Sequence, residues 1–488
     1  MGNRIEQARG KLRLIRKDRL TRNFLSGTSL HIAAQAAQLL TVIYLARMLG
    51  PRHYGLFSMT TAIMAYFMLG MTFGLPTIGI REVARDADTR LRIWKDIARL
   101  RFGLALIVYS LMLVLTFSVP GLKDLRALLP VYGLMLFVIA ILPDWTFIGM
   151  EKMAWPAIAA CAGTSVSLAL LYLLVKGTDD LPLAMGIVLG GSVIGASLLI
   201  GRLLWMSRGL PEVTPRRPVP LFRKAFPFIF SALSSQVYGN ADLILLGFIK
   251  GREAAGIYAA AYKVINLMII LIALVSQATY PAMARIFKAE PDRASEFPTK
   301  VTIVMLAFFL PVAIGGSVLA PSITSFFFGA DYAASAAPLA ILLWYILLSA
   351  VSISFSNALL AVDADRPYIT AITVGALLDV GLIAFLVPRW GVTGAAVSMI
   401  GAEVFIVVYL AASARARLGL RIVSARLMLP VVASSGLMTL AILYLKTRFS
   451  VPAVVAAAGS IYAASLLGLF LLANLTPRAP VVPSRGGT

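Results

Sequence analysis

Cysteine, histidine and charged residues are all scarce in this chain of 488 residues. It holds one cysteine, Cys161, and two histidines, His31 and His53, which are far apart in sequence. A lone cysteine excludes an intramolecular disulfide, and neither residue type is frequent enough for a zinc site. The chain also lacks the G-x-x-x-x-G-K-S/T loop that cradles nucleotide phosphates. We therefore expect no metal, no cofactor and no catalytic residue, and so not an enzyme.

The shortage of charge identifies the solvent. Charged residues make up 14% of the chain and hydrophobic residues 59%, with a mean hydropathy of +0.87, whereas soluble proteins carry about 25% charged residues. A single chain of 52.3 kDa cannot bury this much apolar surface behind a water-facing shell. Lipid must be the main solvent. The excess of 44 basic over 22 acidic residues is then a topology signal, and no nucleic-acid partner is expected.

Long apolar runs predict an all-α polytopic membrane protein with about fourteen spans, since a helix needs about 20 residues to cross ~30 Å of hydrocarbon. Ten runs hold no Asp, Glu, Lys or Arg, and lie at about 24–46, 53–80, 102–122, 127–143, 153–175, 181–201, 301–330, 333–362, 427–445 and 449–477. Four more hold one ionisable residue each: 225–249 (Asp242), 254–284 (Lys263), 367–388 (Asp379) and 390–414 (Glu403).

The distribution of lysine and arginine predicts the orientation. Across the fourteen spans, 33 basic residues lie on the side of the N-terminus and 10 on the other side. Cytoplasmic loops carry the excess of basic residues, so both termini are expected in the cytoplasm. The predicted order is a basic arm (1–22), six spans (23–207), a cytoplasmic linker (208–224), six spans (225–414), a cytoplasmic loop (415–426), two spans (427–475) and a tail (476–488).

An internal repeat relates the two sets of six spans. Segments 45–58 and 247–260 align with one residue of slack at the left end, and an offset of 201 residues pairs Gly50 with Gly251 and Gly55 with Gly256. The same offset pairs Phe57 with Tyr258 and Gln35 with Gln236. Both copies follow the first span of their set, and both sets enter the membrane from the same face. Parallel repeats of this kind are typical of transporters.

Five segments also carry a family resemblance. They are LARMLGPRHYGLFSMTTAI after the first span, FGLPTIGIREVAR at the end of the second, LPDWTFIGMEKM after the fourth, FFFGADYAASAAPLAILL before the tenth and VPRWGVTGAAVS between the eleventh and twelfth. They resemble the polysaccharide transporter (Wzx-type flippase) family of the multidrug/oligosaccharidyl-lipid/polysaccharide exporter superfamily, over about residues 20–475.

The resemblance implies a fold and a function. The expected fold is two six-helix lobes in a V around a central cavity, an N-lobe (23–207) and a C-lobe (225–414), with two additional C-terminal helices. The expected function is export of a lipid-linked oligosaccharide across the bacterial cytoplasmic membrane by alternating access. Its partners would be the lipid-linked glycan, membrane lipid, and a glycan polymerase or other assembly proteins.

Polar stripes on the first span of each set are candidate cavity linings. Thr28, His31, Gln35, Gln38 and Thr41 recur every three or four residues, as do Ser231, Ser235, Tyr238 and Asp242. Such a stripe faces either a wet cavity or a neighbouring helix, where interhelical hydrogen bonds average about 0.6 kcal/mol. We interpret Gln35, Gln38, Gln236 and Tyr238 as substrate contacts.

The ionisable residues inside spans are further candidates, because each costs roughly 2.5 to 3.5 kcal/mol at a helix centre on insertion scales. Asp242 and Lys263 lie at comparable depths on consecutive spans, so one alternative is an ion pair that only locks two helices. In the other, Lys263 offers a cation to a diphosphate or acidic sugar. Asp242, Asp379 and Glu403 then exchange a proton or counter-ion.

Arg47 and Arg81 each end a span, where snorkelling to the interface is the alternative to a ligand role. We include both as candidate contacts to phosphate or sugar acid.

Two other functions compete with the flippase hypothesis. One is a MATE-like exporter of cationic drugs coupled to H⁺ or Na⁺. The positive charge of Lys263 argues against it, because a site for cations should carry little positive charge. The other is a structural scaffold for glycan assembly.

Overall fold

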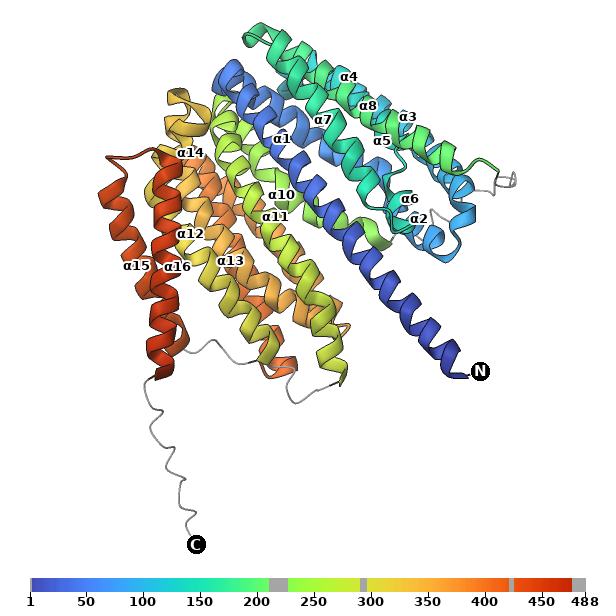
Figure 1. Ribbon diagram of the computed structural model, residues 1–488. Helices are drawn as coiled ribbons and strands as arrows, with labels where there is room; N and C mark the ends of the chain where they lie inside the picture. The colour runs from blue at the N-terminus through green and yellow to red at the C-terminus, as the bar shows by residue number, and fades with distance from the viewer. Residues whose placement is uncertain (1, 210–226, 290–295, 421–424, 476–488) are drawn as a thin grey trace. The chain divides into compact units, whose positions relative to one another are not determined.

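The computed structural model describes residues 2–209, 227–289, 296–420 and 425–475, and these residues form helices without a strand (Figure 1). The expected linker, the middle of the loop 415–426 and the tail lie largely outside this range. The N-terminal half contains α1 (Gly2–Thr72), α2 (Leu75–Arg85), α3 (Arg90–Ser118), α4 (Leu128–Gly133), α5 (Met135–Ile141), α6 (Asp144–Gly149), α7 (Ala154–Leu174) and α8 (Leu181–Met206), with 3₁₀ turns η1 (Ala87–Thr89), η2 (Pro120–Leu125) and η3 (Thr178–Asp180).

The C-terminal half follows the same plan. It contains α10 (Pro227–Ile249), α11 (Arg252–Ala289), α12 (Glu296–Phe328), the 3₁₀ turn η5 (Ala330–Ser335), α13 (Ala336–Leu360), α14 (Asp365–Leu418), α15 (Ala425–Leu445) and α16 (Val451–Leu475). In the described chain, 11 helical segments are long and apolar enough to cross a membrane. The protein is therefore a multi-pass, all-helical membrane protein, as predicted.

Two of the 11 helical segments each contain two expected spans, and a glycine with positive φ interrupts each of them. Gly50 (φ 67°) breaks α1 between the first and second expected spans, and Gly391 (φ 57°) breaks α14 at the start of the twelfth. Glycine adopts this left-handed backbone region without steric cost. Gly251, the repeat partner of Gly50, also has positive φ (93°) and separates α10 from α11. The repeat is thus present in backbone conformation as well as in sequence.

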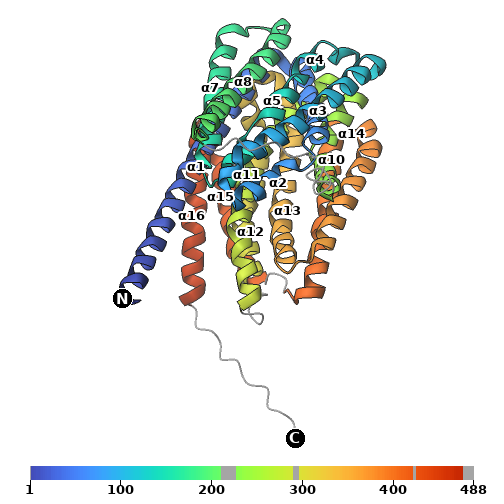
Figure 2. The same ribbon diagram turned by 90° about the vertical axis from the view of Figure 1, so that its right-hand side faces the viewer.

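The chain divides into two compact units, each described here by itself. The first comprises Met1–Ala260 and Asp379–Ala395, and the second Ala261–Leu378 and Ala396–Thr488. In the first, α1 packs along α7 and α10, α7 packs on α8, and α2 packs on α6 (Figure 1 and Figure 2). In the second, α12 packs against α13 and α15, and α15 against α16.

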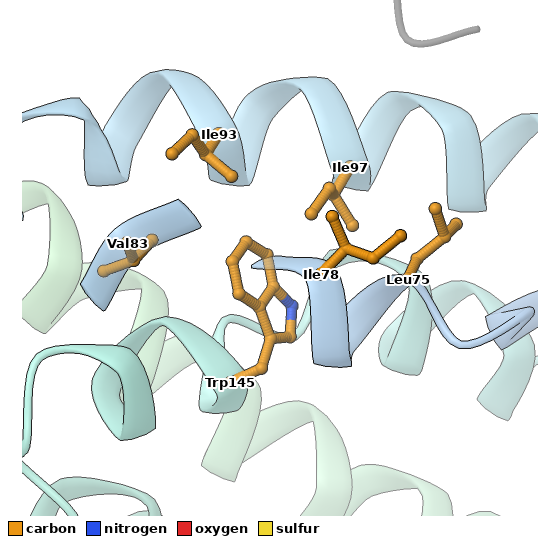
Figure 3. Close-up of a cluster of buried hydrophobic side chains, with 6 residues drawn as sticks. All are labelled: Leu75, Ile78, Val83, Ile93, Ile97 and Trp145. Carbon is orange, nitrogen blue, oxygen red and sulfur yellow. The ribbon is translucent and has the colours of Figure 1, made fainter. Parts of the chain in front are cut away.

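An apolar cluster holds the short helices of the first unit together. Trp145 of α6 points toward α3 and lies beside α2, where it meets the isoleucines Ile78, Ile93 and Ile97 (Figure 3). A Cβ atom at Gly79 would lie 2.4 Å from the Trp145 ring, so α2 approaches α6 closely only because residue 79 is glycine. The cluster fixes the positions of α2, α3 and α6, which end near one another.

Candidate functional site

Asp242 is the best-defined buried charge of the first unit. It lies on α10 with 1% of its surface exposed. The hydroxyl of Tyr258, a fully buried residue of α11, donates a hydrogen bond to its Oδ2, and the backbone N–H of Leu243 donates to its Oδ1 at 2.8 Å. A buried carboxylate is tolerated only when such donors compensate its lost hydration. Hydrogen bonds from these two donors thus fix the position of the Asp242 carboxylate.

A second carboxylate belongs to the same neighbourhood. Asp379, on α14, is 1% exposed and falls within the first compact unit. Tyr66 of α1 interacts electrostatically with both Asp242 and Asp379. Asp242 and Asp379 are thus two buried carboxylates within electrostatic range of the same phenol. We call Tyr66, Asp242, Tyr258 and Asp379 the first-unit acidic cluster.

Glu403 lies in the second unit, on the part of α14 that follows the Gly391 break. It is 2% exposed, and its Oε1 accepts a hydrogen bond of 2.8 Å from the Ser352 hydroxyl of α13. The three predicted intramembrane carboxylates are thus divided between the two units, with Asp242 and Asp379 in the first and Glu403 in the second. Asp242 and Asp379 share a neighbour, whereas Glu403 has a hydroxyl partner of its own.

A polar network also joins α11 and α13 in the second unit. The side-chain amide of Asn357 donates to the Ser276 hydroxyl at 3.0 Å and to the Thr279 hydroxyl at 3.4 Å. Asn357 is 4% exposed, so these bonds satisfy a buried amide. The network links α11 to α13 through Asn357, which follows Ser352, the partner of Glu403, by more than one turn of α13.

The polar stripe on α1 separates into side chains with different surroundings. Gln35 is half-buried and Gln38 is exposed, whereas Thr41 is buried and its hydroxyl donates to the Ala37 carbonyl of its own helix at 2.9 Å. Gln236 and Tyr238 on α10 are half-buried. Because α1 and α10 pack together, the two stripes belong to neighbouring helices. The roles of these residues as substrate contacts stay predictions, as does cavity lining.

The two halves of the repeat differ chemically at the acidic cluster. At the offset of 201, Asp242 corresponds to Thr41 and Tyr258 corresponds to Phe57. The first half therefore has neither the carboxylate nor the phenol hydroxyl that donates to it. The backbone plan is duplicated while the charge is not.

The candidate cations occupy different places. Lys263 is half-buried on α11 and falls in the second unit, while Arg47 on α1 and Arg81 on α2 are exposed residues of the first. The ion pair between Lys263 and Asp242 stays a prediction, since the two residues belong to different units. The described donors to Asp242 are Tyr258 and Leu243.

Sequence reasoning missed the hydroxyl partners. The sequence singles out Tyr258 as an aromatic repeat position and as a candidate for stacking on sugar rings, but not as a hydrogen-bond donor, and it does not single out Tyr66 or Ser352. A usable signal existed for Tyr258 alone, because it replaces Phe57 in the repeat just where a buried carboxylate needs a donor.

Comparisons with known proteins are consistent with this geometry. A family model described as "Polysaccharide biosynthesis protein" matches residues 20–287, more than half of the chain. A putative O-antigen transporter of Escherichia coli (strain K12) is 24% identical over 293 residues, 58% of this chain and 70% of that protein. A probable low-salt glycan biosynthesis flippase of Haloferax volcanii is 22% identical over 211 residues, 41% of this chain and 44% of that protein.

Solved structures share the fold. The lipid II flippase MurJ in an inward closed conformation superposes with a TM-score of 0.74 at 16% identity, covering 92% of this chain and 99% of that chain. An inward-facing multidrug resistance MATE transporter of the MOP superfamily reaches a TM-score of 0.65 at 14% identity, covering 81% and 98%. At these identities the likeness concerns the fold alone.

Proposed function

The chain belongs to the polysaccharide biosynthesis protein family, and from this membership we propose that it is a flippase for a lipid-linked oligosaccharide or polysaccharide precursor. The observation that carries the proposal is the agreement between relatives: one is a putative O-antigen transporter, another a probable glycan biosynthesis flippase. The fold shared with a lipid II flippase supports it. The substrate would be a polyprenyl diphosphate glycan, moved from the inner to the outer leaflet of the bacterial cytoplasmic membrane by alternating access.

The chemistry of such a substrate assigns roles to the candidate contacts. Its diphosphate is anionic, its glycan presents many hydroxyls, and its polyprenyl tail remains in lipid. Lys263, Arg47 and Arg81 supply cations for the diphosphate or for acidic sugars, in keeping with the preference of phosphate for Lys and Arg donors. Gln35, Gln38, Gln236 and Tyr238 supply hydrogen bonds for the glycan. Translocation makes and breaks no covalent bond, so no enzymatic role is proposed.

The buried carboxylates supply the coupling chemistry. Charged side chains within a bilayer are costly and usually mark proton or ion pathways. In the first-unit acidic cluster, the Tyr258 hydroxyl holds Asp242 while Tyr66 lies near both carboxylates. Glu403 has Ser352 as its donor in the second unit. We assign proton or counter-ion exchange to Asp242, Asp379 and Glu403.

The function is tested in the host organism by depleting the protein and analysing extracted lipids by mass spectrometry. A flippase predicts accumulation of a polyprenyl diphosphate glycan that is protected from externally added glycosidase. Re-expression of the wild-type chain is the control and should restore the normal lipid profile. Retention of cationic dyes without glycan-lipid accumulation would instead identify a MATE-like exporter coupled to H⁺ or Na⁺.

Coupling is tested in proteoliposomes with imposed pH or Na⁺ gradients. Glu403→Gln keeps a hydrogen-bonding group beside Ser352 but cannot carry the charge, so gradient-stimulated transport should be lost. Ser352→Ala keeps the charge and should retain a measurable response. Tyr409→Phe on the same helix is the matched control, because no described partner uses its hydroxyl. Transport by the wild type that ignores both gradients would remove all three carboxylates from the coupling role.

A further inference from the structure

A cationic pocket lies at the ends of three helices in the first unit, outside the candidate site. It has a volume of about 420 Å³ and is lined by Arg90, Met150, Lys152, Arg202, Trp205 and Met206. Arg90 begins α3, Lys152 lies between α6 and α7, and Arg202 lies in the last turns of α8. These residues lie at the ends of segments long and apolar enough to cross a membrane, or between two of them, and we expect the pocket to open on the side where basic residues concentrate.

The charges of the pocket are only partly balanced. Its lining includes three basic side chains and no acidic one. Arg90 donates to the Met206 carbonyl and lies 3.6 Å from Asp88, a side chain that is 80% exposed. Glu151 precedes Lys152 in sequence and is exposed. For Arg202, by contrast, the described chain provides no carboxylate within 4 Å, and its buried Nε has no hydrogen-bond partner there.

The three cations line one pocket, and their charges oppose one another. Partial burial lowers the pKa of the Lys152 ammonium, and the nearby charges of Arg90 and Arg202 lower it further. Like charges gathered in this way are stabilised when an anion enters between them.

The guanidinium of Arg202 is held in place by two aromatic rings. Its central carbon lies 4.3 Å from the ring centre of Trp155 and 4.2 Å from that of Trp205. Stacking on indoles restrains the plane of the guanidinium while leaving its N–H edge for an acceptor. Phosphate oxygens match that edge through two parallel hydrogen bonds.

The surroundings identify the source of the phosphate. Exposed apolar side chains flank the pocket on the same elements: Ile148, Met153, Leu204 and Trp205, with exposed fractions of 37 to 55%. Surfaces of this kind face acyl chains in a membrane protein, and a pocket of 300 to 1,000 Å³ is typical of small-ligand sites. We propose that the Arg90–Lys152–Arg202 pocket binds the phosphate headgroup of an anionic membrane phospholipid. This site is independent of the transported substrate.

Binding is measured by native mass spectrometry of the purified full-length chain titrated with phosphatidylglycerol, with phosphatidylcholine as the neutral lipid. The wild type should bind one phosphatidylglycerol in preference to phosphatidylcholine. Lys152→Gln/Arg202→Gln should weaken this binding about tenfold, the equivalent of one lost charge-assisted pair. Lys95→Gln/Arg417→Gln, which removes two exposed cations from helices expected to end on the same face, should bind like the wild type.

Two single variants keep the proposal testable if the double variant does not fold. Because Lys152 is an exposed residue between helices, Lys152→Gln alone folds even if Arg202→Gln does not, and should still bind more weakly. Arg202→Lys keeps the charge without the planar fork and should bind with intermediate affinity. Equal phosphatidylglycerol binding by the pocket variant and the control variant overturns the proposal. Saturable binding of inorganic phosphate by the wild type, together with equal binding of phosphatidylglycerol and phosphatidylcholine, overturns the assignment to a lipid.

Discussion

Gly55 and Gly256 face each other across the contact between the repeats. A Cβ built on Gly55 would lie 1.8 Å from the Arg252 carbonyl oxygen, and one built on Gly256 would lie 1.8 Å from that of Pro51. The offset of 201 residues that pairs the two glycines also pairs Pro51 with Arg252. The contact is thus reciprocal, as expected for parallel repeats related by an axis along the membrane normal.

Substitution of either glycine should therefore be costly. Gly55→Ala forces a methyl group into a backbone carbonyl that no side-chain movement can relieve, and we expect a loss of about 1 to 3 kcal/mol of stability. Thermal unfolding of the purified protein measures this. Gly190→Ala is the control, because a Cβ there meets nothing within 4 Å, and alanine favours a helix by up to about 1 kcal/mol. Equal midpoints for the two variants would contradict the close approach.

Removal of the Tyr258 hydroxyl should disturb Asp242. In Tyr258→Phe the buried carboxylate loses a donor, and an unsatisfied buried group costs about 1 to 3 kcal/mol. Transport should fall with stability, because the carboxylate is no longer held in place. Combining the change with Asp242→Asn should add little further loss, since the two residues form one interaction. Strictly additive unfolding free energies in this double-mutant cycle would show that the pair is not coupled.

Arg252 should contribute more to the stability of the protein than Asp124, its acidic partner. Its guanidinium donates to the carbonyls of Gly121 at 2.7 Å and Gly247 at 3.0 Å, and lies 3.2 Å from Asp124. The Arg252 side chain is 13% exposed and that of Asp124 56% exposed. We expect Asp124→Asn to cost under about 1 kcal/mol and Arg252→Gln about 1.5 to 3 kcal/mol. Added salt should reduce the first difference but not the second; equal losses would show that the ion pair dominates.

Lys152 gives a prediction for pH. Its pKa is lowered in the folded protein from the usual 10.5, so charged Lys152 weakens the native state at neutral pH. This penalty disappears as pH rises above the lysine pKa of the unfolded chain.

In a zwitterionic detergent, Lys152→Gln should therefore unfold at a higher temperature than the wild type near neutral pH. The difference should shrink as pH approaches the lysine range. Thermal unfolding measured across pH provides the check, with Lys95→Gln as the reference for an exposed lysine. A wild type that is the more stable protein at neutral pH would show that the three cations do not repel one another.

Much of the fold follows from local properties of the sequence. Long apolar runs predict spans because each helix must satisfy its backbone internally in lipid. The break at Gly50 falls between two predicted spans and the break at Gly391 at the start of the twelfth, because glycine adopts a positive φ without steric cost. Asp242, Asp379 and Glu403 are buried, as expected for rare charges in apolar helices.

The partners of these charges could not be predicted, because they depend on helix packing and not on spacing. Tyr258 donates a hydrogen bond to Asp242 from the next helix. Ser352, which donates to Glu403, precedes it by 51 residues. The same limit applies to loop charges. Lys152 and Arg202 count in the sequence as two markers of orientation, whereas the structure brings them into one pocket with Arg90.

The stacking of Arg202 on two indoles also has an optical consequence. Trp155 and Trp205 are two of only six tryptophans in the chain, and the emission of an indole responds to a charge held against its ring. An anion that neutralises Arg202 changes the local field at both chromophores together. Occupancy of the pocket is therefore reported by the intrinsic fluorescence of the unlabelled protein, in a bilayer and in real time.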